Sequence, residues 1–128
     1  MTKLPTAIAP LKWDVFLASS IPVDTGDLAP GMKRQIWSPM SATLIYGERD
    51  AVLVDALMTL NQAHELADWI AASGKNLKVI YATHGHGDHF FGAGTILERF
   101  PGARFVARPD VVQVMRTQVS PQPRERLD

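Results

Sequence analysis

The sequence predicts a domain of the α/β (α+β) class, with a mixed sheet and flanking helices. Two observations lead to this prediction. The first half of the chain contains short apolar runs bounded by turn residues, and the second half alternates amphipathic helical segments with short apolar runs. Strands followed by helix–strand alternation indicate a sheet with helices on at least one face. The length of 128 residues fits one domain.

Four strands are predicted in the first half of the chain. They cover Lys12–Ser19, Lys33–Trp37, Ala42–Tyr46 and Ala51–Asp55. The segment Pro22–Gly31 is rich in Pro, Gly and Asp, so it is predicted to be a loop. The last two strands are joined at Gly47–Asp50, which we expect to form a hairpin turn. The run Val52–Val54 is apolar and mostly β-branched, which suits a buried strand.

The clearest predicted helix runs from Thr59 to Ser73. Thr59 and Gln62 have the spacing of a capping box, and Gly74 is a typical C-terminal stop. An apolar stripe at helical spacing predicts the face that packs on the core: Leu60, Ala63, Leu66, Ala67, Ile70 and Ala71.

The remaining elements alternate strand and helix. We expect a strand at Leu77–Thr83, a helix from Asp88 to Phe100, a strand at Ala103–Ala107 and a weaker helix from Pro109 to Val119. Five residues of the second helix would face the core: Phe90, Ala93, Ile96, Leu97 and Phe100. Residues 120–128 are polar, charged and proline-containing, so residues 1–119 form the predicted domain and 120–128 a disordered tail.

Composition excludes several classes of function. The formal net charge is zero and basic residues form no stripe with aromatics, which argues against binding to nucleic acid or to an anionic membrane. Cysteine is absent, so any metal must be held by histidines and carboxylates. Lys12 and Asp14 interrupt the only apolar stretch near the N-terminus, and we therefore expect a cytoplasmic protein.

Three of the four histidines lie within the six residues His84–His89. Imidazole and carboxylate are ligands of Zn²⁺, Fe and Mn. His84 and His86 are two residues apart at the end of a predicted strand, so both imidazoles can point toward one ion. Asp88 could ligate a second ion or accept a proton from metal-activated water. We expect the glycines between them, Gly85 and Gly87, to remove side-chain bulk and let the loop turn tightly.

Simpler explanations exist for individual residues. Asp88 could be a helix N-cap, and His64 is expected to be a surface residue without a role. Asp55 ends a predicted strand, where it could serve turn chemistry. Alternatively, Asp55 could support the metal loop from the second shell, since a ligating histidine usually donates its other N–H to a carboxylate or carbonyl.

The run YATHGHGDHFFGA at residues 81–93, with AVLVDAL at 51–57, resembles the metallo-β-lactamase-fold hydrolases. The H-x-H-x-D-H motif of that family is present as His84, His86, Asp88 and His89. The resemblance runs from Lys33 to Ser120 and corresponds to the N-terminal half of the family's domain. His89 is more similar to the glyoxalase II, lactonase and phosphodiesterase branches than to β-lactamases with a cysteine on the second zinc.

The resemblance implies half of an αββα sandwich with one or two zinc ions, for which Fe or Mn could substitute. His84 and His86 would bind the first ion, and Asp88 and His89 the second. A bridging hydroxide would attack an ester, thioester, lactone, amide or phosphodiester of a small-molecule substrate. Asp55 lies at the position of the family's upstream strand-end aspartate.

The family's remaining ligands, a third histidine, a bridging Asp or Cys and a last histidine, have no counterpart after His89. We therefore expect a metal-dependent hydrolase that is inactive or weakly active as a 128-residue chain. The alternative is a non-catalytic metal-binding or association module that forms a homo-oligomer through an uncovered sheet face.

Overall fold

The computed structural model describes residues 10–18 and 39–119. The predicted loop Pro22–Gly31, the predicted strand Lys33–Trp37 and the tail 120–128 lie outside the described residues. Most other expected elements are present within one or two residues of their expected bounds. Among the described residues, none of the helices combines the length and the hydropathy that a membrane crossing requires.

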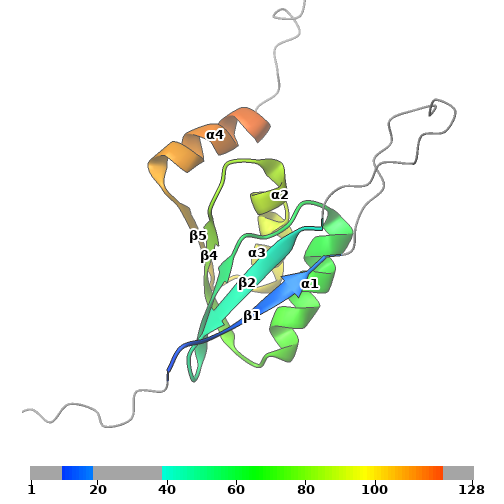
Figure 1. Cartoon of the computed structure of the whole chain (residues 1–128), viewed down its shortest axis with the longest axis vertical. Helices are drawn as coiled ribbons and strands as arrows, with labels where there is room; N and C mark the ends of the chain where they lie inside the picture. Colours follow the sequence, from blue (N-terminus) through cyan, green and yellow to red (C-terminus); the bar gives the residue numbers. More distant parts are fainter. Residues whose placement is uncertain (1–9, 19–38, 120–128) are drawn as a thin grey trace, which may run out of the picture.

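A mixed five-stranded sheet forms the centre of the fold (Figure 1). Its strands lie in sequence order, β1-β2-β3-β4-β5. The first three pair antiparallel, whereas β3–β4 and β4–β5 pair parallel. The strands are β1 Lys12–Leu17, β2 Ser41–Tyr46, β3 Asp50–Val54, β4 Asn76–Ala82 and β5 Arg104–Ala107. Helical crossovers join the parallel strands, as the helix–strand alternation predicted.

Four helical segments accompany the sheet, and the first begins as predicted. They are α1 Leu60–Ala72, α2 Gly87–Phe90, α3 Ala93–Arg99 and α4 Pro109–Val119. The hydroxyl of Thr59 accepts the backbone N–H of Gln62, and the Gln62 side chain accepts the N–H of Thr59, so the capping box is confirmed. Gly74 follows the helix with a φ of 71°, which glycine adopts without strain.

The helix expected from Asp88 to Phe100 is interrupted at Phe91 and Gly92. The cause is a close backbone approach from the loop after β3. Gly92 N donates to Leu57 O at 3.1 Å, and a Cβ on Gly92 would lie only 2.0 Å from Ala56 O. This tertiary contact ends α2 after one turn and lets α3 start in a new direction, which helical periodicity alone does not reveal.

The core lies between one face of the sheet and the helices α1 and α3. Ala42, Leu44, Ala51 and Leu53 alternate with less buried residues along β2 and β3, as expected for strands covered on one face. The stripe of α1 supplies the opposing wall: Ala63, Leu66, Ala67 and Ile70 are fully buried. Leu60 and Ala71 had been expected in that stripe, but both are exposed, Leu60 by 64%. The core therefore covers only the middle turns of α1.

Among the described residues, no helix covers the opposite face of the sheet along β1. Along β1, the even-numbered Phe16 packs toward the core, with its ring 5.5 Å from that of Trp69. The odd-numbered apolar residues point the other way and are exposed: Leu11 by 73%, Trp13 by 67%, Val15 by 45% and Leu17 by 71%. Strand register extends this face in a row across the sheet, through Trp13, Ile45, Val52, Val79 and Arg104. We refer to this surface as the open face.

Candidate metal centre

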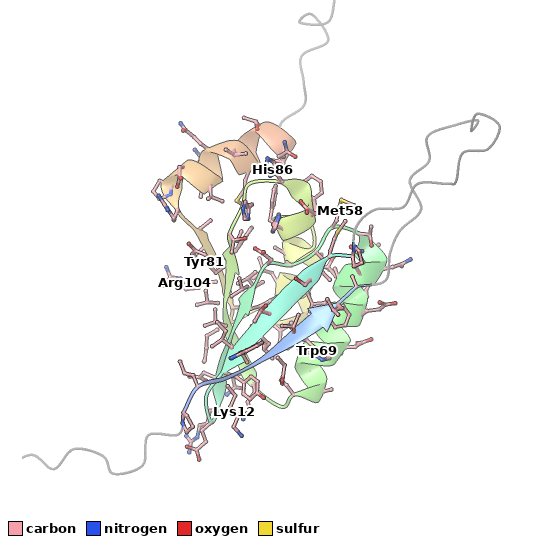
Figure 2. All side chains as sticks on the ribbon, in the orientation of Figure 1. Lys12, Met58, Trp69, Tyr81, His86 and Arg104 are labelled. Carbon is pink, nitrogen blue, oxygen red and sulfur yellow. The ribbon has the colours of Figure 1, made fainter. Side chains whose placement is uncertain are left out.

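The histidine cluster lies just past the carboxyl end of β4, in the loop that leads into α2. His84 and His86 are exposed, whereas Asp88 and His89 are half-buried on the first turn of α2. The view with side chains places His86 at the end of the molecule where α2 lies (Figure 2). Exposed imidazoles at the end of a strand are available to a ligand.

The three imidazoles gather around His84. The ring of His84 lies 4.5 Å from that of His89 and 6.5 Å from that of His86, between centroids. The rings of His84 and His86 are within 17° of parallel. Asp88 Oδ2 is 3.5 Å from His89 Nε2, too far for a strong hydrogen bond.

Asp55 contacts the ring of His89 at Nδ1. Its Oδ2 lies 2.8 Å from His89 Nδ1, and its side chain is only 13% exposed. Asp55 adopts a φ of 66°, a left-handed conformation that aspartate tolerates better than most residues. Its backbone N–H donates to Tyr81 O at 2.8 Å, which anchors it at the ends of β3 and β4. This geometry leaves His89 Nε2 directed away from Asp55 and available to an ion.

Thr83 is a member of the site that the sequence reasoning missed. Its backbone N–H donates to Asp55 Oδ1 at 2.8 Å, and its Oγ1 lies 2.8 Å from His84 Nδ1. A threonine at the end of a strand is ordinarily explained by strand propensity, so no sequence signal separates it from its neighbours. The contact with Asp55 spans 28 positions and becomes visible only in the fold.

The two glycines of the cluster are required by close packing. Neither has a positive φ, so the loop turns here without the left-handed backbone conformation that favours glycine. A Cβ on Gly85 would lie 2.5 Å from the Cβ of Val114 in α4, and one on Gly87 would lie 2.2 Å from the ring of Phe91. The glycines thus let α4 and Phe91 approach the loop closely.

Asp88 is not the N-cap of α2. That position belongs to His86, whose side chain makes no capping hydrogen bond, and Asp88 lies one residue inside the helix. A carboxylate in the first turn is favoured by the partial positive charge of a helix N-terminus, although α2 is only four residues long. The role of Asp88 as a metal ligand or proton acceptor therefore stays a prediction.

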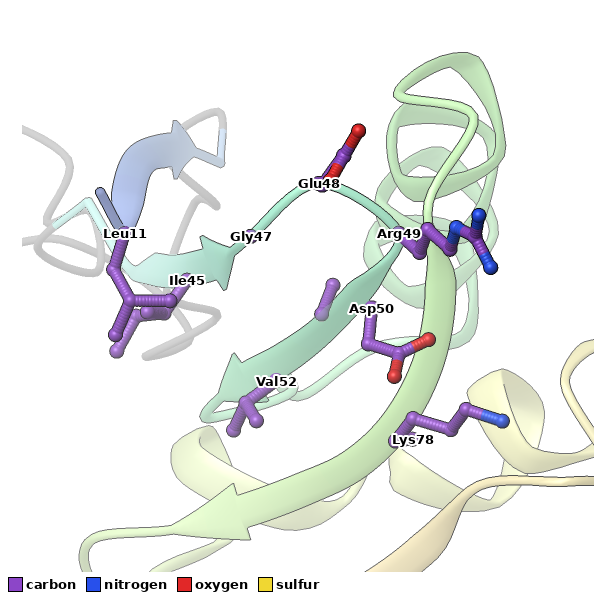
Figure 3. Close-up of a pocket in the computed structure, with 9 residues that line it drawn as sticks. Leu11, Ile45, Gly47, Glu48, Arg49, Asp50, Val52 and Lys78 are labelled. Atoms are coloured by element: carbon purple, nitrogen blue, oxygen red, sulfur yellow. The ribbon is translucent and has the colours of Figure 1, made fainter. Parts of the chain in front are cut away.

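A hollow on the surface of the described residues is remote from this cluster. It has a volume of about 560 Å³ and is lined by residues around the β2–β3 turn (Figure 3), including Leu11, Ile45, Arg49 and Lys78. That turn lies where β3 begins, whereas the histidines follow the end of its parallel neighbour β4. The hollow belongs to the open face, and it contributes nothing to the histidine cluster.

The donor types fit zinc, but their arrangement does not complete a site. Imidazole nitrogens and carboxylate oxygens are the ligands that zinc takes where cysteine is absent. Within residues 10–18 and 39–119, however, no three His, Asp or Glu side chains converge closely enough to hold one ion. The described residues supply donors in pairs, and the ligand roles of His84, His86, Asp88 and His89 stay predictions.

Comparison with known sequences and structures gives the family. The sequence model of the metallo-beta-lactamase superfamily matches residues 36–126. No curated protein matches the chain. Because the family model covers well over half of the sequence, the chain belongs to the metallo-β-lactamase superfamily.

Solved structures agree with this assignment. The metallo-β-lactamase SMB-1, in a complex with mercaptoacetic acid, is 32% identical over 65% of this chain and 33% of its own, with a TM-score of 0.54. The enzyme FIM-1 from Pseudomonas aeruginosa, in its mono-zinc form, is 16% identical over 91% of this chain and 50% of its own, with a TM-score of 0.59. A metallo-β-lactamase from Pontibacter korlensis is 20% identical over 95% of this chain and 49% of its own, with a TM-score of 0.62.

These matches also show how much of the metallo-β-lactamase fold the chain contains. The chain spans at most about half of each of these solved enzymes. Its mixed sheet and helices correspond to about half of the αββα sandwich, as the sequence predicted. The structures named above are β-lactamases, and none of them is a glyoxalase II or a lactonase.

Proposed function

We propose that this chain provides the His84–His89 half of the centre of a metal-dependent hydrolase. The observation that supports this most strongly is the pairing of His84 and His89, with ring centroids 4.5 Å apart, beside the half-buried carboxylate of Asp55. Neither packing nor helix capping requires imidazoles to gather at the end of a strand. A ligating histidine usually has a carboxylate or carbonyl partner on its second nitrogen, and His89 has one.

Each residue has a proposed role. His84 and His86 would hold one ion, Asp88 and His89 would hold or share a second, and Asp55 fixes the ring of His89. The chemistry that zinc supplies at such a centre is the activation of water near neutral pH for attack on a carbonyl or phosphoryl group. Because the described side chains offer no three donors to one ion, a group outside the described residues would provide the remaining ligand.

The substrate class follows from the relatives. The solved relatives are named as metallo-β-lactamases, which favours the cyclic amide of a β-lactam as the first substrate to test. His89 in place of a cysteine motivates thioesters and lactones as the next candidates, in keeping with the sequence resemblance to glyoxalase II and lactonases. All of these are small molecules with an activated carbonyl carbon.

Metal binding gives the primary test. The purified chain is dialysed to equilibrium against zinc buffered by a weak chelator, and bound zinc is measured for the wild type and for single His→Gln variants. We expect H84Q, H86Q and H89Q to lower the affinity at least about 10-fold each. The control is H64Q, because His64 is exposed on α1, and it should bind like the wild type. A wild-type chain that binds no zinc would refute the proposal. A zinc affinity of H64Q as low as that of the three other variants would also refute it.

Hydrolysis gives the second test and identifies the substrate class. A chromogenic β-lactam, a thioester and a lactone are offered to the zinc-loaded chain before and after chelation. We expect at most slow turnover of one class, and any such turnover should be abolished by chelation and restored by added zinc. Turnover that persists in chelator would contradict a metal-dependent reaction.

The open face supports a second candidate function, association with another copy of the chain. Exposed apolar surface on an edge strand, here Trp13, Val15 and Leu17, is typical of interaction surfaces. Sedimentation velocity of L17E tests this, with L60E as the matched control on α1, since the two leucines are 71% and 64% exposed. We expect L17E alone to shift a dimer toward monomer. A monomeric wild type would exclude this function.

A further inference from the structure

The Thr83 hydroxyl lies between the Asp55 carboxylate and the His84 ring. Its Oγ1 is 3.0 Å from Asp55 Oδ1, 2.9 Å from Asp55 Oδ2 and 2.8 Å from His84 Nδ1. All three contacts are within hydrogen-bond distance, yet the hydroxyl carries a single proton. The position of that proton therefore decides the protonation pattern of His84.

One arrangement satisfies every group. If the hydroxyl donated to His84, its oxygen lone pairs would face both carboxylate oxygens of Asp55 at 2.9–3.0 Å with no proton between them. An ionised carboxylate is only an acceptor, so such a contact is repulsive. If the hydroxyl donates to Asp55 instead, its oxygen is free to accept from His84. The proton of neutral His84 then lies on Nδ1.

We propose that Thr83 is a positioning residue that holds His84 as its Nδ1–H tautomer through an Asp55–Thr83–His84 hydrogen-bond chain. The same carboxylate accepts Nδ1–H of His89 directly at 2.8 Å. Asp55 therefore sets the tautomer of two histidines, one directly and one through Thr83. Both rings then carry a free lone pair on Nε2, the form in which a neutral imidazole binds a metal.

The backbone fixes this chain of groups in place. Thr83 N donates to Asp55 Oδ1 at 2.8 Å, and Asp55 N donates to Tyr81 O at 2.8 Å. Asp55 is thus held at two points, its carboxylate by Thr83 and its backbone N–H by Tyr81, on either side of the buried Ala82. Since these contacts need no ion, the tautomers are set in the metal-free chain. Only the use of the free nitrogens depends on the proposed function.

Nitrogen NMR of the metal-free chain tests the tautomers. Histidine ring nitrogens are observed by long-range proton–nitrogen correlation at a pH above the imidazole titration, for the wild type, T83V and T83S. We expect Nδ1–H on both His84 and His89 in the wild type. In T83V, His84 should change to the Nε2–H form that a free imidazole prefers in water, while His89 stays unchanged. T83S restores the hydroxyl and should restore Nδ1–H on His84.

Two results would overturn the proposal. One is a wild-type His84 with its proton on Nε2, a measurement that does not depend on how any variant folds. The other is a folded T83V in which His84 keeps Nδ1–H. The exposed His64 serves as the internal reference, since neither substitution should alter it.

Zinc affinity separates this proposal from the proposed function. By chelator competition we expect T83V to bind zinc about 10-fold more weakly than the wild type, with T83S close to the wild type. T83V that binds zinc as tightly as the wild type would contradict a positioning role. A wild-type chain with the expected tautomers but no zinc binding would refute the metal function and leave the hydrogen-bond chain intact.

Discussion

The Nδ1 of His89 lies 2.8 Å from Oδ2 of Asp55, a residue 34 positions earlier in the chain. This contact joins the end of β3 to the first turn of α2, and it brings a half-buried carboxylate beneath a cluster of imidazoles. Asp55 also accepts two hydrogen bonds from Thr83, which follows β4. Asp55 therefore connects the ends of β3 and β4 to the histidine loop. Its removal should affect stability and metal binding together.

Replacing Asp55 by asparagine tests that connection. The amide group of asparagine must present a donor where the carboxylate accepts from either Thr83 or His89. We expect D55N to lose about 1–3 kcal/mol of unfolding free energy and about 10–100-fold in zinc affinity. Urea denaturation and chelator competition measure the two effects. The matched control is E65Q on the exposed face of α1, which should change neither. A D55N chain with wild-type zinc affinity would exclude the supporting role of Asp55.

Gly92 and Gly94 form a matched pair for the break between α2 and α3. A Cβ at Gly92 would meet Ala56 O at 2.0 Å, whereas one at Gly94 has nothing within 4 Å. We expect G92A to destabilise the fold by several kcal/mol, because backbone must move, and G94A to stabilise it by about 0.5–1 kcal/mol. Thermal unfolding compares the two. Equal effects of both substitutions would show that the close approach of Gly92 is not required.

The capping box of α1 predicts the cost of removing Thr59. Its hydroxyl accepts the N–H of Gln62 at 3.1 Å, which alanine cannot do. We expect T59A to lower the unfolding free energy by about 1 kcal/mol. Thr117 lies within α4, exposed, with its hydroxyl on the carbonyl of Val114, so T117A should be neutral or slightly stabilising. Denaturant midpoints for the two variants should therefore move apart, and a T59A midpoint equal to the wild type would contradict the cap.

The pKa of Tyr46 should depend on Asp14. The Tyr46 hydroxyl donates to Asp14 Oδ2 at 2.9 Å. This hydrogen bond, then burial, and then the charge of Asp14 raise the pKa of Tyr46 above its ordinary 10.0. A raised pKa in the fold means that the neutral form is favoured there. Its contribution to stability is complete below the unfolded pKa and is lost as pH rises through the folded value.

Tyrosinate absorbance tests this in a Y81F background, in which Tyr46 is the remaining tyrosine. We expect D14A to lower the titration midpoint of Tyr46 toward its ordinary value. D110A removes an exposed carboxylate elsewhere and should leave the midpoint unchanged. Identical midpoints with and without Asp14 would show that the contact does not operate in solution.

The sequence predicted the elements whose signals are local. The capping box at Thr59, the stop at Gly74 and the apolar run of β3 each depend on neighbours within a few residues, and each is present. The break at Gly92 was not predicted, because its cause is a backbone contact with Ala56. The exposure of Leu60 was also missed, since periodicity gives the direction of a side chain and not the extent of the surface facing it.

The candidate site shows the same division. The spacing of His84, His86, Asp88 and His89 is readable in the sequence because all four lie within six consecutive residues. Asp55 could be placed near them by the usual need of a ligating histidine for a carboxylate partner and by resemblance to the family, whereas Thr83 could not be placed at all, because its partner is 28 residues away. Contacts between distant segments set the tautomers and orientation that the motif alone leaves open.

The most direct test of the central claim is a zinc titration of the chain followed by the ring nitrogens of its four histidines. The account predicts that zinc shifts the nitrogen resonances of His84, His86 and His89, while those of His64 stay in place. Shifts confined to His64, or no shift at any histidine with zinc in excess, would contradict the assignment of this loop as a metal centre.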